Sequence, residues 1–315
     1  FESGLDWIEV GHGSGLAASV KGYGKAIESD EAYLETCSQN KEARWGMFCI
    51  PGIGELKDVK LAAKYKMKFI RIGVNPNDIE LSFPFIELAK NKGMTVFVNF
   101  MKSYTSSPKE FAEYVSIAKN NGADFAYIVD SAGGMMPHEL KEYITACRDH
   151  SDIKLGFHGH NNLGLSISNS ITAVENGVDI IDTSLQGMGR SAGNTPTEMF
   201  CFVLDRLGYE HNLDIFKLLN IGEKLVRPFL KNKYGTSSLD TVAGYSKFHS
   251  SYMNLILKFA KKYSIDPRKI IIEVSLIDRL NPDNAILEKA CEKLIREKED
   301  LTLNLKFNKY YGNEQ

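Results

Sequence analysis

The sequence predicts an α/β fold: a TIM-type (β/α)8 barrel whose first βα unit is largely absent from this chain, followed by a small helical C-terminal domain. Three observations lead to this prediction. Short apolar runs recur along the first two-thirds of the chain, amphipathic stretches separate them, and the alternation stops near residue 210. Several runs are apolar at successive positions, which is typical of parallel strands covered on both faces.

Seven of these runs are predicted strands. Their first residues lie about 24 to 38 residues apart, which is the length of one βα unit. Seven units with Gly-rich strand exits favour an eight-fold barrel without its first unit over the competing doubly wound sheet. The predicted strands are Asp6–Val10, Arg44–Ile50, Lys68–Val74, Thr95–Phe100, Phe125–Asp130, Lys154–His160 and Asp179–Ser184.

The stretches between the runs carry helix signals. One of them follows a Pro-Gly pair and places Leu56, Val59 and Ala62 at helical spacing. Another opens with Ser107-Pro108, an N-cap followed by a first-turn proline. The predicted helices of the barrel are Glu55–Lys66, a stretch that opens at Ser107-Pro108 and ends at Asn120-Asn121-Gly122, Pro137–His150 and Leu163–Glu175.

Beyond residue 210 the strand pattern gives way to helical patterns alone. Residues 1–210 are therefore assigned to the barrel and residues 211–315 to the helical C-terminal domain. The predicted helices of this domain are Leu213–Pro228, Tyr245–Tyr263 and Asn284–Lys298.

The composition is that of an ordinary globular protein. Lys and Arg number 38 against 40 Asp and Glu, and a net charge of −2 gives no electrostatic case for nucleic acid or an anionic membrane. No apolar run reaches the ~18 residues of a membrane helix, and no signal peptide is visible. The five cysteines are scattered without disulfide or metal-binding spacing, so we expect a reducing, cytoplasmic location.

His158 and His160 are the strongest candidate site residues. Residues i and i+2 of a strand project to the same side, so both imidazoles leave the end of the predicted strand Lys154–His160 together. Two imidazoles on one face can hold one divalent ion, with a carboxylate or water completing its ligands. Spacing alone leaves chance open, because seven histidines produce a His-x-His pair in roughly one chain in six.

Other polar residues follow predicted strands at the same rim. They are Glu9 and His12 after the first strand, Lys102 and Ser131 after the fourth and fifth, and Asn194 in the loop beyond the last. Barrel chemistry is assembled from several strand ends, so this clustering is expected of a site. Taken singly, each residue also has a structural interpretation, such as a bond to a backbone amide.

Two glycine clusters fail the test for a nucleotide loop. Gly11–Gly15 and Gly187–Gly189 follow predicted strands, but neither forms a G-x-G-x-x-G that opens a helix. A dinucleotide cofactor is therefore not expected, whereas loop amides could bind phosphate or carboxylate. No G-x-S-x-G elbow of a serine hydrolase is present.

A longer motif surrounds the two histidines. Gly156–Gly164 (GFHGHNNLG) and Gly187–Asn194 (GMGRSAGN) closely resemble the metal-dependent 4-hydroxy-2-oxovalerate aldolases. That family is part of a group of barrel lyases and synthases that includes 3-hydroxy-3-methylglutaryl-CoA lyase and isopropylmalate synthase. The resemblance covers nearly the whole chain, more faintly in its C-terminal part. Supporting segments are Ile8–Gly13, Pro51–Gly54 and Asp130–Gly134.

The resemblance implies a carbon–carbon lyase that cleaves or forms a 4-hydroxy-2-oxo acid through a metal-stabilised pyruvate enolate. It implies that His158 and His160 bind Mn²⁺ or Mg²⁺, with Zn²⁺ less expected. Ser131 would help to hold the 2-oxo acid, Asn194 would lie at the edge of the metal, and Glu9 would support an arginine that polarises the substrate. A homo-oligomer and an acetaldehyde dehydrogenase-like partner are also implied.

Two departures qualify the resemblance. The family's first strand carries an aspartate ligand, a catalytic arginine and a basic histidine in an Arg-Asp-Gly loop, and we expect these residues upstream of Phe1. The aldolases also place an active-site tyrosine where this chain has His249. A histidine could transfer a proton near neutral pH, which leaves substrate and stereochemistry open; the alternative is a surface histidine on a helix.

Three other functions stay open on the sequence. The same metal site could serve an acyl-CoA lyase or a Claisen-type synthase, although no CoA-binding addition is recognisable. Lys102, at the end of its strand, could form a Schiff base in a metal-independent aldolase. A catalytically inactive barrel retained for interactions is the third alternative.

Overall fold

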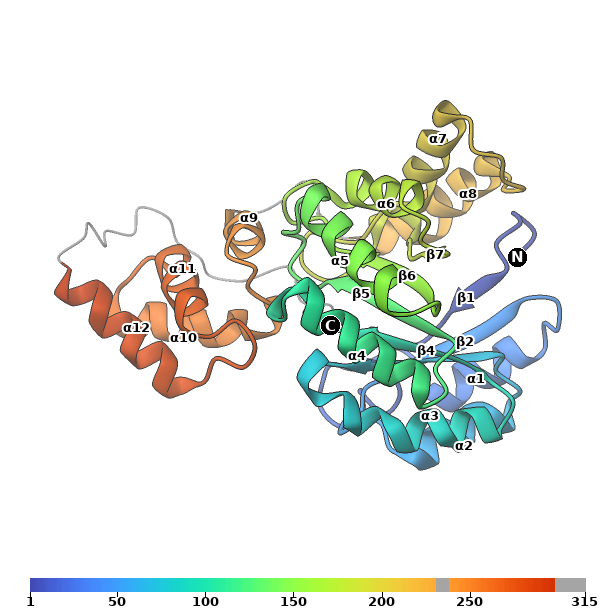
Figure 1. The fold of residues 1–315 in the computed structure, drawn as a ribbon, viewed down its shortest axis with the longest axis horizontal. Coiled ribbons are helices and arrows are strands. Elements are labelled where there is room, and N and C mark those ends of the chain that lie inside the picture. Colours follow the sequence, from blue (N-terminus) through green and yellow to red (C-terminus); the bar gives the residue numbers. More distant parts are fainter. Residues whose placement is uncertain (231–237, 298–315) are drawn as a thin grey trace.

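The computed structural model describes residues 1–230 and 238–297. Its centre is one sheet in which seven strands lie in chain order and every neighbouring pair is parallel (Figure 1). Each strand lies within its predicted range, so the strand prediction is confirmed. The strands are β1 (Trp7–Glu9), β2 (Arg44–Cys49), β3 (Phe69–Val74), β4 (Thr95–Phe100), β5 (Phe125–Asp130), β6 (Lys154–Gly159) and β7 (Ile180–Ile181).

Helices alternate with these strands, and this alternation around a parallel sheet in chain order is that of a TIM-type barrel (Figure 1). After α7 the strands stop and the described chain continues as helices and turns, as predicted. The α-helices are α1 (Asp30–Ser38), α2 (Leu56–Lys64), α3 (Phe83–Asn91), α4 (Pro108–Asn120), α5 (Pro137–His150), α6 (Ser166–Glu175), α7 (Thr197–Leu207), α8 (Ile215–Ile221), α9 (Ser238–Tyr245), α10 (Met253–Tyr263), α11 (Pro267–Ile277) and α12 (Asn284–Arg296).

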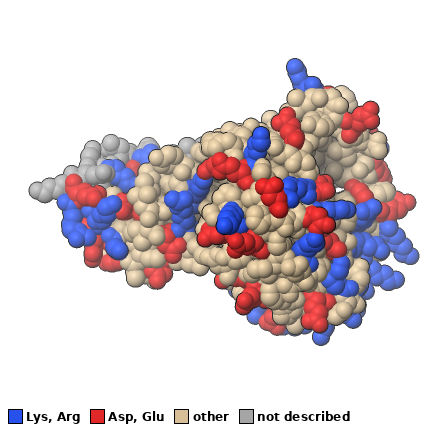
Figure 2. Space-filling model, in the orientation of Figure 1, with Lys and Arg blue, Asp and Glu red and all other residues tan. Residues whose placement is uncertain are grey.

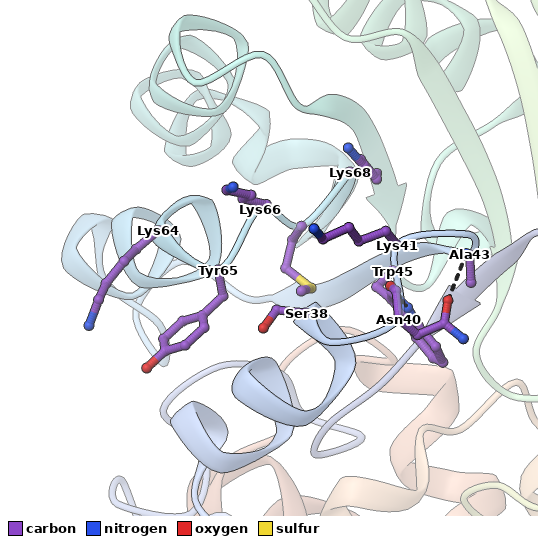
Figure 3. Close-up of a pocket in the computed structure, with 10 residues that line it drawn as sticks. Ser38, Asn40, Lys41, Ala43, Trp45, Lys64, Tyr65, Lys66 and Lys68 are labelled. Atoms are coloured by element: carbon purple, nitrogen blue, oxygen red, sulfur yellow. Dashed lines mark hydrogen bonds between the residues drawn. The ribbon is translucent and has the colours of Figure 1, made fainter.

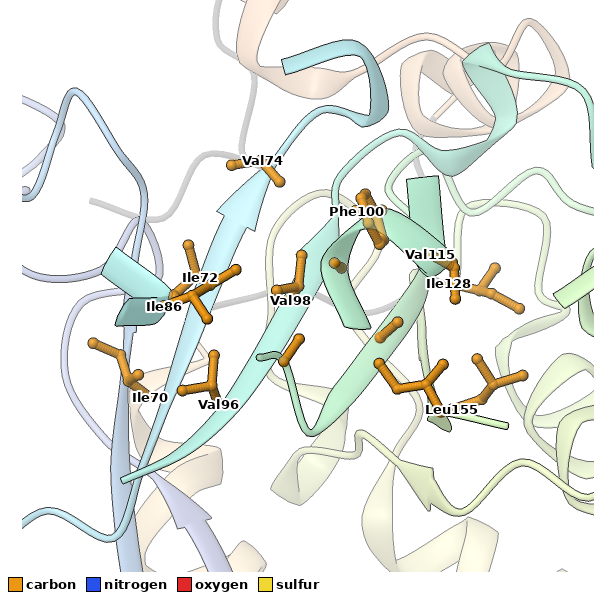
Figure 4. Packing of buried hydrophobic residues seen from close by; sticks show 14 of the residues in the cluster. Ile70, Ile72, Val74, Ile86, Val96, Val98, Phe100, Val115, Ile128 and Leu155 are labelled. Carbon is orange, nitrogen blue, oxygen red and sulfur yellow. The ribbon is translucent and has the colours of Figure 1, made fainter. Parts of the chain in front are cut away.

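One face of the sheet packs against the helices. Ile70 and Ile72 of β3, Val96 and Val98 of β4 and Val115 of α4 are fully buried in this layer (Figure 4). Burial of one such side chain stabilises the fold by about 1.5–3 kcal/mol, so this layer is the main source of hydrophobic stability in the barrel.

The opposite face of the strands lines the barrel interior, and it changes character along the strands. Toward the amino ends it is aromatic: Trp7, Phe69, Phe97 and Phe125 pack in sequence, with ring centroids of successive pairs 4.6 to 5.3 Å apart. Arg71 follows Phe69 on the same face of β3 because strand side chains alternate. Aromatic side chains thus fill the interior of the barrel near the amino ends of the strands, and charged groups lie nearer the carboxyl ends.

One predicted helix is wrong at its start. The sequence pattern predicts a single helix over Tyr245–Tyr263, but α9 ends at Tyr245 and α10 begins at Met253. Lys247 takes a left-handed conformation (φ 52°), and the amide of Phe248 donates to the carbonyl of Ala243. The chain therefore turns back on α9, a turn that buries Phe248 and that apolar periodicity does not reveal.

Other helix predictions need smaller corrections. The predicted helix Leu213–Pro228 is interrupted, because α8 ends at Ile221 and one π turn, Gly222–Val226, follows. Gly222 packs against the side chain of Glu198, where a Cβ would lie 2.3 Å from a carboxylate oxygen. The last predicted helix ends at Arg296, and its predicted end at Lys298 lies outside the described residues. The helices α1, α3, α7, α9 and α11 were not predicted.

The C-terminal helices have their own apolar core and also contact the barrel. Buried side chains from Leu239 to Leu294 form that core, separate from the core of the barrel. A Cβ on Gly134, in the loop after β5, would lie 2.0 Å from the carbonyl oxygen of Gly244 in α9, so only glycine permits this approach. The boundary at residue 210 stays a prediction.

The visible surface mixes charges of both signs. Acidic and basic side chains are interspersed over the face drawn in Figure 2. All five cysteines are free thiols, four of them buried. Among the helices of residues 1–230 and 238–297, each falls short of the length and apolarity that crossing a bilayer requires.

Candidate active site

His158 and His160 lie together at the carboxyl end of β6. Their ring centroids are 5.1 Å apart. Nδ1 of His158 lies 2.9 Å from a carboxylate oxygen of Asp182, and Nδ1 of His160 lies 3.2 Å from the carbonyl oxygen of Arg190. Because each ring is held through Nδ1, its Nε2 remains available for a ligand.

The ring of His160 is neutral near pH 7. Burial, with smaller contributions from His158 and Arg190, lowers the pKa of His160 to about 3. With Nδ1–H donating to a carbonyl oxygen, the neutral ring carries its lone pair on Nε2, which is the form that coordinates a metal.

Asn194 lies beside His160. The two residues form an isolated antiparallel β-bridge. The side-chain nitrogen Nδ2 of Asn194 donates to the carbonyl oxygen of Met188 at 3.1 Å. Its side-chain oxygen is buried and has no hydrogen-bond partner among the described residues. An unpartnered buried amide oxygen is costly unless a ligand satisfies it, so this atom is a candidate ligand for a cation.

Arg71 of β3 forms ion pairs with residues at both edges of the sheet, β1 and β7. Its guanidinium donates to Glu9 at the end of β1 (2.9 Å) and to Asp182 just after β7. Burial would raise the pKa of Asp182, but Arg71 and His158 hold it below its usual value. Asp182 therefore stays ionised, and one carboxylate orients both the arginine and a candidate metal ligand.

Ser131 and Lys102 meet at the same end of the barrel. The amide of Lys102, whose φ is 57°, donates to the hydroxyl of Ser131 at 2.9 Å. The Nζ of Lys102 turns toward the C-terminal helices, where it donates to the carbonyl of Leu280 at 2.7 Å and lies 5.3 Å from the ring centre of Tyr252.

His249 comes to this site from the C-terminal part of the chain. It precedes a short 3₁₀ turn, Ser250–Tyr252, and its Nδ1 accepts the amide of Ser251 at 3.2 Å. Burial, followed by Arg190, Lys102 and His160, lowers the pKa of His249 well below its usual value. With Nδ1 as an acceptor, the neutral ring carries its proton on Nε2.

The structure thus brings the predicted residues to one end of the barrel, although their roles stay predictions. His12 instead accepts the amide of Ser14 at 2.9 Å, a local loop contact. Sequence reasoning missed Asp182, Arg71 and Arg190. Arg71 had a signal, because a charged residue within an apolar strand is uncommon and calls for a buried partner.

The donor set fits a divalent cation. Two imidazoles with the amide oxygen of Asn194 form a mixed nitrogen and oxygen donor set, which suits a first-row divalent cation. The carboxylate of Asp182 orients the ring of His158 through its Nδ1. Among the described residues no third Cys, His, Asp or Glu joins the pair in a metal-binding group.

A separate pocket lies at the other end of the strands. It measures about 330 Å³ and is lined by Trp45, Tyr65 and several lysines, including Lys66 and Lys68, which precede β3 (Figure 3). None of the site residues described above lines it. Chemistry in TIM-type barrels takes place at the carboxyl ends, so we assign the site by its side chains and not by this pocket.

Comparison with known proteins shows the family to which the chain belongs. The family model described as HMGL-like matches residues 2–225. The 4-hydroxy-2-oxovalerate aldolase of Bacillus thuringiensis (strain Al Hakam) is 35% identical over 274 residues, which are 87% of this chain and 80% of the relative. That of Carboxydothermus hydrogenoformans is 36% identical over 273 residues, 86% of this chain and 81% of the relative.

Solved structures share the fold at lower identity. The N-terminal domain of an aldolase candidate from Bacteroides vulgatus matches with a TM-score of 0.68 and 24% identity, covering 83% of this chain and 88% of that one. The carboxyl transferase domain of Rhizobium etli pyruvate carboxylase matches with a TM-score of 0.74 and 15% identity, covering 94% of this chain and 55% of that one. At such identities the likeness concerns the fold alone.

Proposed function

This chain belongs to the HMGL-like family, and from that membership we propose that it is a carbon–carbon lyase, a divalent-metal-dependent aldolase that acts on a 4-hydroxy-2-oxo acid. The observation that carries the proposal is the pair His158 and His160, each held through Nδ1 with Nε2 available, beside the unpartnered oxygen of Asn194. A site of this kind, at the carboxyl ends of a parallel barrel, suits metal-assisted cleavage.

His158, His160 and Asn194 would hold the ion. A divalent cation, Mn²⁺ or Mg²⁺, would supply Lewis-acid polarisation of the 2-oxo group, which lowers the energy of the enolate that cleavage of the C3–C4 bond leaves behind. Ser131 would donate a hydrogen bond to the 2-oxo acid, since its hydroxyl accepts the amide of Lys102 and keeps its own proton to give.

His249 is proposed as a hydrogen-bond donor to the substrate. Its lowered pKa and its acceptor Nδ1 make the neutral ring a weak base but leave Nε2–H free to donate. Cleavage needs a general base to remove the 4-hydroxyl proton, and donation from Nε2–H would stabilise the alkoxide oxygen at C4. The C3–C4 bond then breaks to give the aldehyde and the enolate, and the enolate takes up a proton to give pyruvate. Glu9 would act indirectly, by holding Arg71 in place.

The test measures the release of pyruvate from 4-hydroxy-2-oxovalerate by the full-length protein. Lactate dehydrogenase serves as the coupling enzyme that reports the pyruvate. We expect a chelator to abolish the activity and Mn²⁺ or Mg²⁺ to restore it. His160→Ala should lose at least about 100-fold in activity and in metal affinity while its unfolding curve stays close to that of the wild type. The exposed His138 provides a matched control, His138→Ala, that should behave as wild type.

Several outcomes would contradict this proposal. Activity that survives the chelator, together with covalent trapping of pyruvate on Lys102 by borohydride, would indicate a Schiff-base aldolase. Cleavage of an acyl-CoA substrate in place of the 4-hydroxy-2-oxo acid would assign the metal site to a different reaction. Metal binding with no turnover of either substrate class would leave an inactive barrel.

A further inference from the structure

Three basic side chains from separate parts of the chain gather near His160. They are Lys102 after β4, Arg190 in the loop after β7, and His249 before α10, and we call them the basic cluster. Lys102 and His249 both lie near the ring of Tyr252, and the carbonyl oxygen of Arg190 lies beside the ring of His160. The positive charges of Arg190 and Lys102 also lower the pKa of His249.

Tyr252 connects two members of the basic cluster. The Nζ of Lys102 lies 5.3 Å from the centre of its ring, and the ring of His249 lies 6.5 Å from the same ring. The hydroxyl of Tyr252 and Nζ of Lys102 also donate to one carbonyl oxygen, that of Leu280, at 2.9 and 2.7 Å. Lys102 and His249 therefore both lie close to the ring of Tyr252.

Arg190 joins the cluster beside the metal-binding residues. Its carbonyl oxygen lies 3.2 Å from Nδ1 of His160, and its guanidinium reaches the hydroxyl of Ser14 at a long 3.4 Å. Arg71, by contrast, is saturated by two carboxylates. Within residues 1–230 and 238–297, no carboxylate lies at ion-pair distance from Arg190.

The two carboxylates whose charges act on Lys102 form hydrogen bonds to other groups. Asp278 accepts the amides of Leu280 and Asn281, and Asp78 accepts the side-chain amide of Asn75. Lys102 itself is 7% exposed, and within the described residues its Nζ has only a carbonyl oxygen as hydrogen-bond acceptor. Among the described residues no carboxylate lies at ion-pair distance from Lys102. A buried cation in that position is costly, and an anionic ligand would offset that cost.

We propose that the basic cluster binds a second anionic group on the substrate, so that the preferred substrate is a 4-hydroxy-2-oxo acid with a carboxylate or phosphate at the end remote from the 2-oxo group. This inference rests on the proposed function and narrows its substrate class. Arg190 and Lys102 supply the charge, and Nε2–H of His249 supplies a further donor.

The reaction itself is unchanged by this specificity. In the direction of synthesis, the methyl carbon of pyruvate loses a proton, that carbon forms a bond with the aldehyde carbon, and the aldehyde oxygen takes up a proton. The anionic group of the aldehyde is only bound. It keeps its charge and breaks no bond.

The test compares acceptor aldehydes with the full-length protein, Mn²⁺ and pyruvate. Succinic semialdehyde carries a carboxylate, glycolaldehyde phosphate carries a phosphate, and butanal and propanal are neutral references of similar length. We expect kcat/KM for one of the anionic aldehydes to exceed that of its neutral reference by roughly 100-fold, as two charge-assisted hydrogen bonds would give. Equal values for charged and neutral aldehydes would overturn the proposal.

Substitutions in the basic cluster test whether its side chains cause the preference for anionic aldehydes. Arg190→Gln and Lys102→Met should each reduce the ratio of anionic to neutral kcat/KM by about tenfold. Arg206→Gln and Lys92→Met, at exposed positions, are matched controls that should leave the ratio unchanged. If the variants lower both values equally, the cluster binds the carboxylate of pyruvate instead, and the proposal is wrong.

A second readout separates this proposal from the proposed function. The methyl protons of pyruvate exchange for deuterium only if the enzyme forms the enolate, and this exchange needs no aldehyde. It can be measured by NMR. Metal-dependent exchange without a preference for anionic aldehydes would overturn the substrate class alone. Absence of exchange in the metal-loaded protein would overturn the aldolase function, and the inference with it.

Discussion

Asp182 is the residue on which the geometry of the site most depends. Its carboxylate accepts from Nδ1 of His158 at 2.9 Å and also from the guanidinium of Arg71. A carboxylate behind a metal-binding histidine fixes the orientation and the tautomer of the ring and increases its basicity. Asp182 is therefore important for the site although it is not proposed as a metal ligand: it acts by holding the ring of His158.

Replacement of Asp182 should weaken metal binding without removing a ligand. Asp182→Asn keeps the shape of the side chain but loses the charge, and we expect Mn²⁺ affinity to fall about 10- to 100-fold in a calorimetric titration. Asp149→Asn, at an exposed position on α5, is the control. Unchanged affinity in Asp182→Asn would show that His158 does not depend on this carboxylate.

The preference for anionic aldehydes should weaken at high pH, where Lys102 loses its proton. Burial, with Arg190 adding to it and Asp278 and Asp78 opposing it, lowers the pKa of Lys102 to about 8. The amine is charged below that pH and loses its charge above it. We therefore expect the ratio of anionic to neutral kcat/KM to fall about tenfold between pH 7 and pH 9 in the wild type. In Lys102→Met the ratio should not change over that range.

The sequence predicted part of this site because some signals are local. His158 and His160 are two positions apart on one strand, so their common direction follows from strand geometry. Arg190 and Asp182 gave no such signal, since their roles depend on contacts with residues about 20 to 110 positions away in the chain. His249 was identified only by resemblance, and its hydrogen bond to Ser251 came from the turn that the helix prediction missed.

Among the elements, β3 contributes the side chain that links the two edges of the sheet. Arg71 reaches Glu9 at the end of β1 and Asp182 after β7, so one buried cation pairs with two carboxylates inside the barrel. Removal of the cation would leave two negative charges in a partly buried site without the arginine that pairs with both.

Arg71→Met should therefore destabilise the fold by about 3–5 kcal/mol, measured by urea unfolding. The double variant Arg71→Met, Asp182→Asn should recover part of this loss, because it removes one of the unpaired charges. A loss below about 1 kcal/mol in the single variant, or no recovery in the double variant, would contradict the assignment of Arg71 as the link between the edges.

Strands and some helices were predictable because their signals are short-range. β4 and β5 match their predicted bounds, and α5 does so as well, since an apolar run or a first-turn proline marks each of them. The bend between α9 and α10 was missed because it depends on burial of Phe248 and on the conformation of Lys247, which are set by packing against the rest of the C-terminal helices.

At the scale of the whole molecule, the site combines two parts of the chain. The barrel contributes the histidine pair, Asn194 and Arg190, whereas the C-terminal helices contribute His249 and Tyr252. The carbonyl of Leu280 holds Lys102 from the same side. The sequence divided these regions by pattern but could not predict that the smaller one would approach the carboxyl ends of the strands.

The central claim is that His158 and His160 together bind a catalytic divalent ion. Anomalous diffraction from crystals of the full-length protein grown with Mn²⁺ tests it most directly. We expect one manganese peak within coordination distance of Nε2 of both rings, with Asn194 at its edge. A peak elsewhere, or none at this pair in a protein shown to contain manganese, would contradict it.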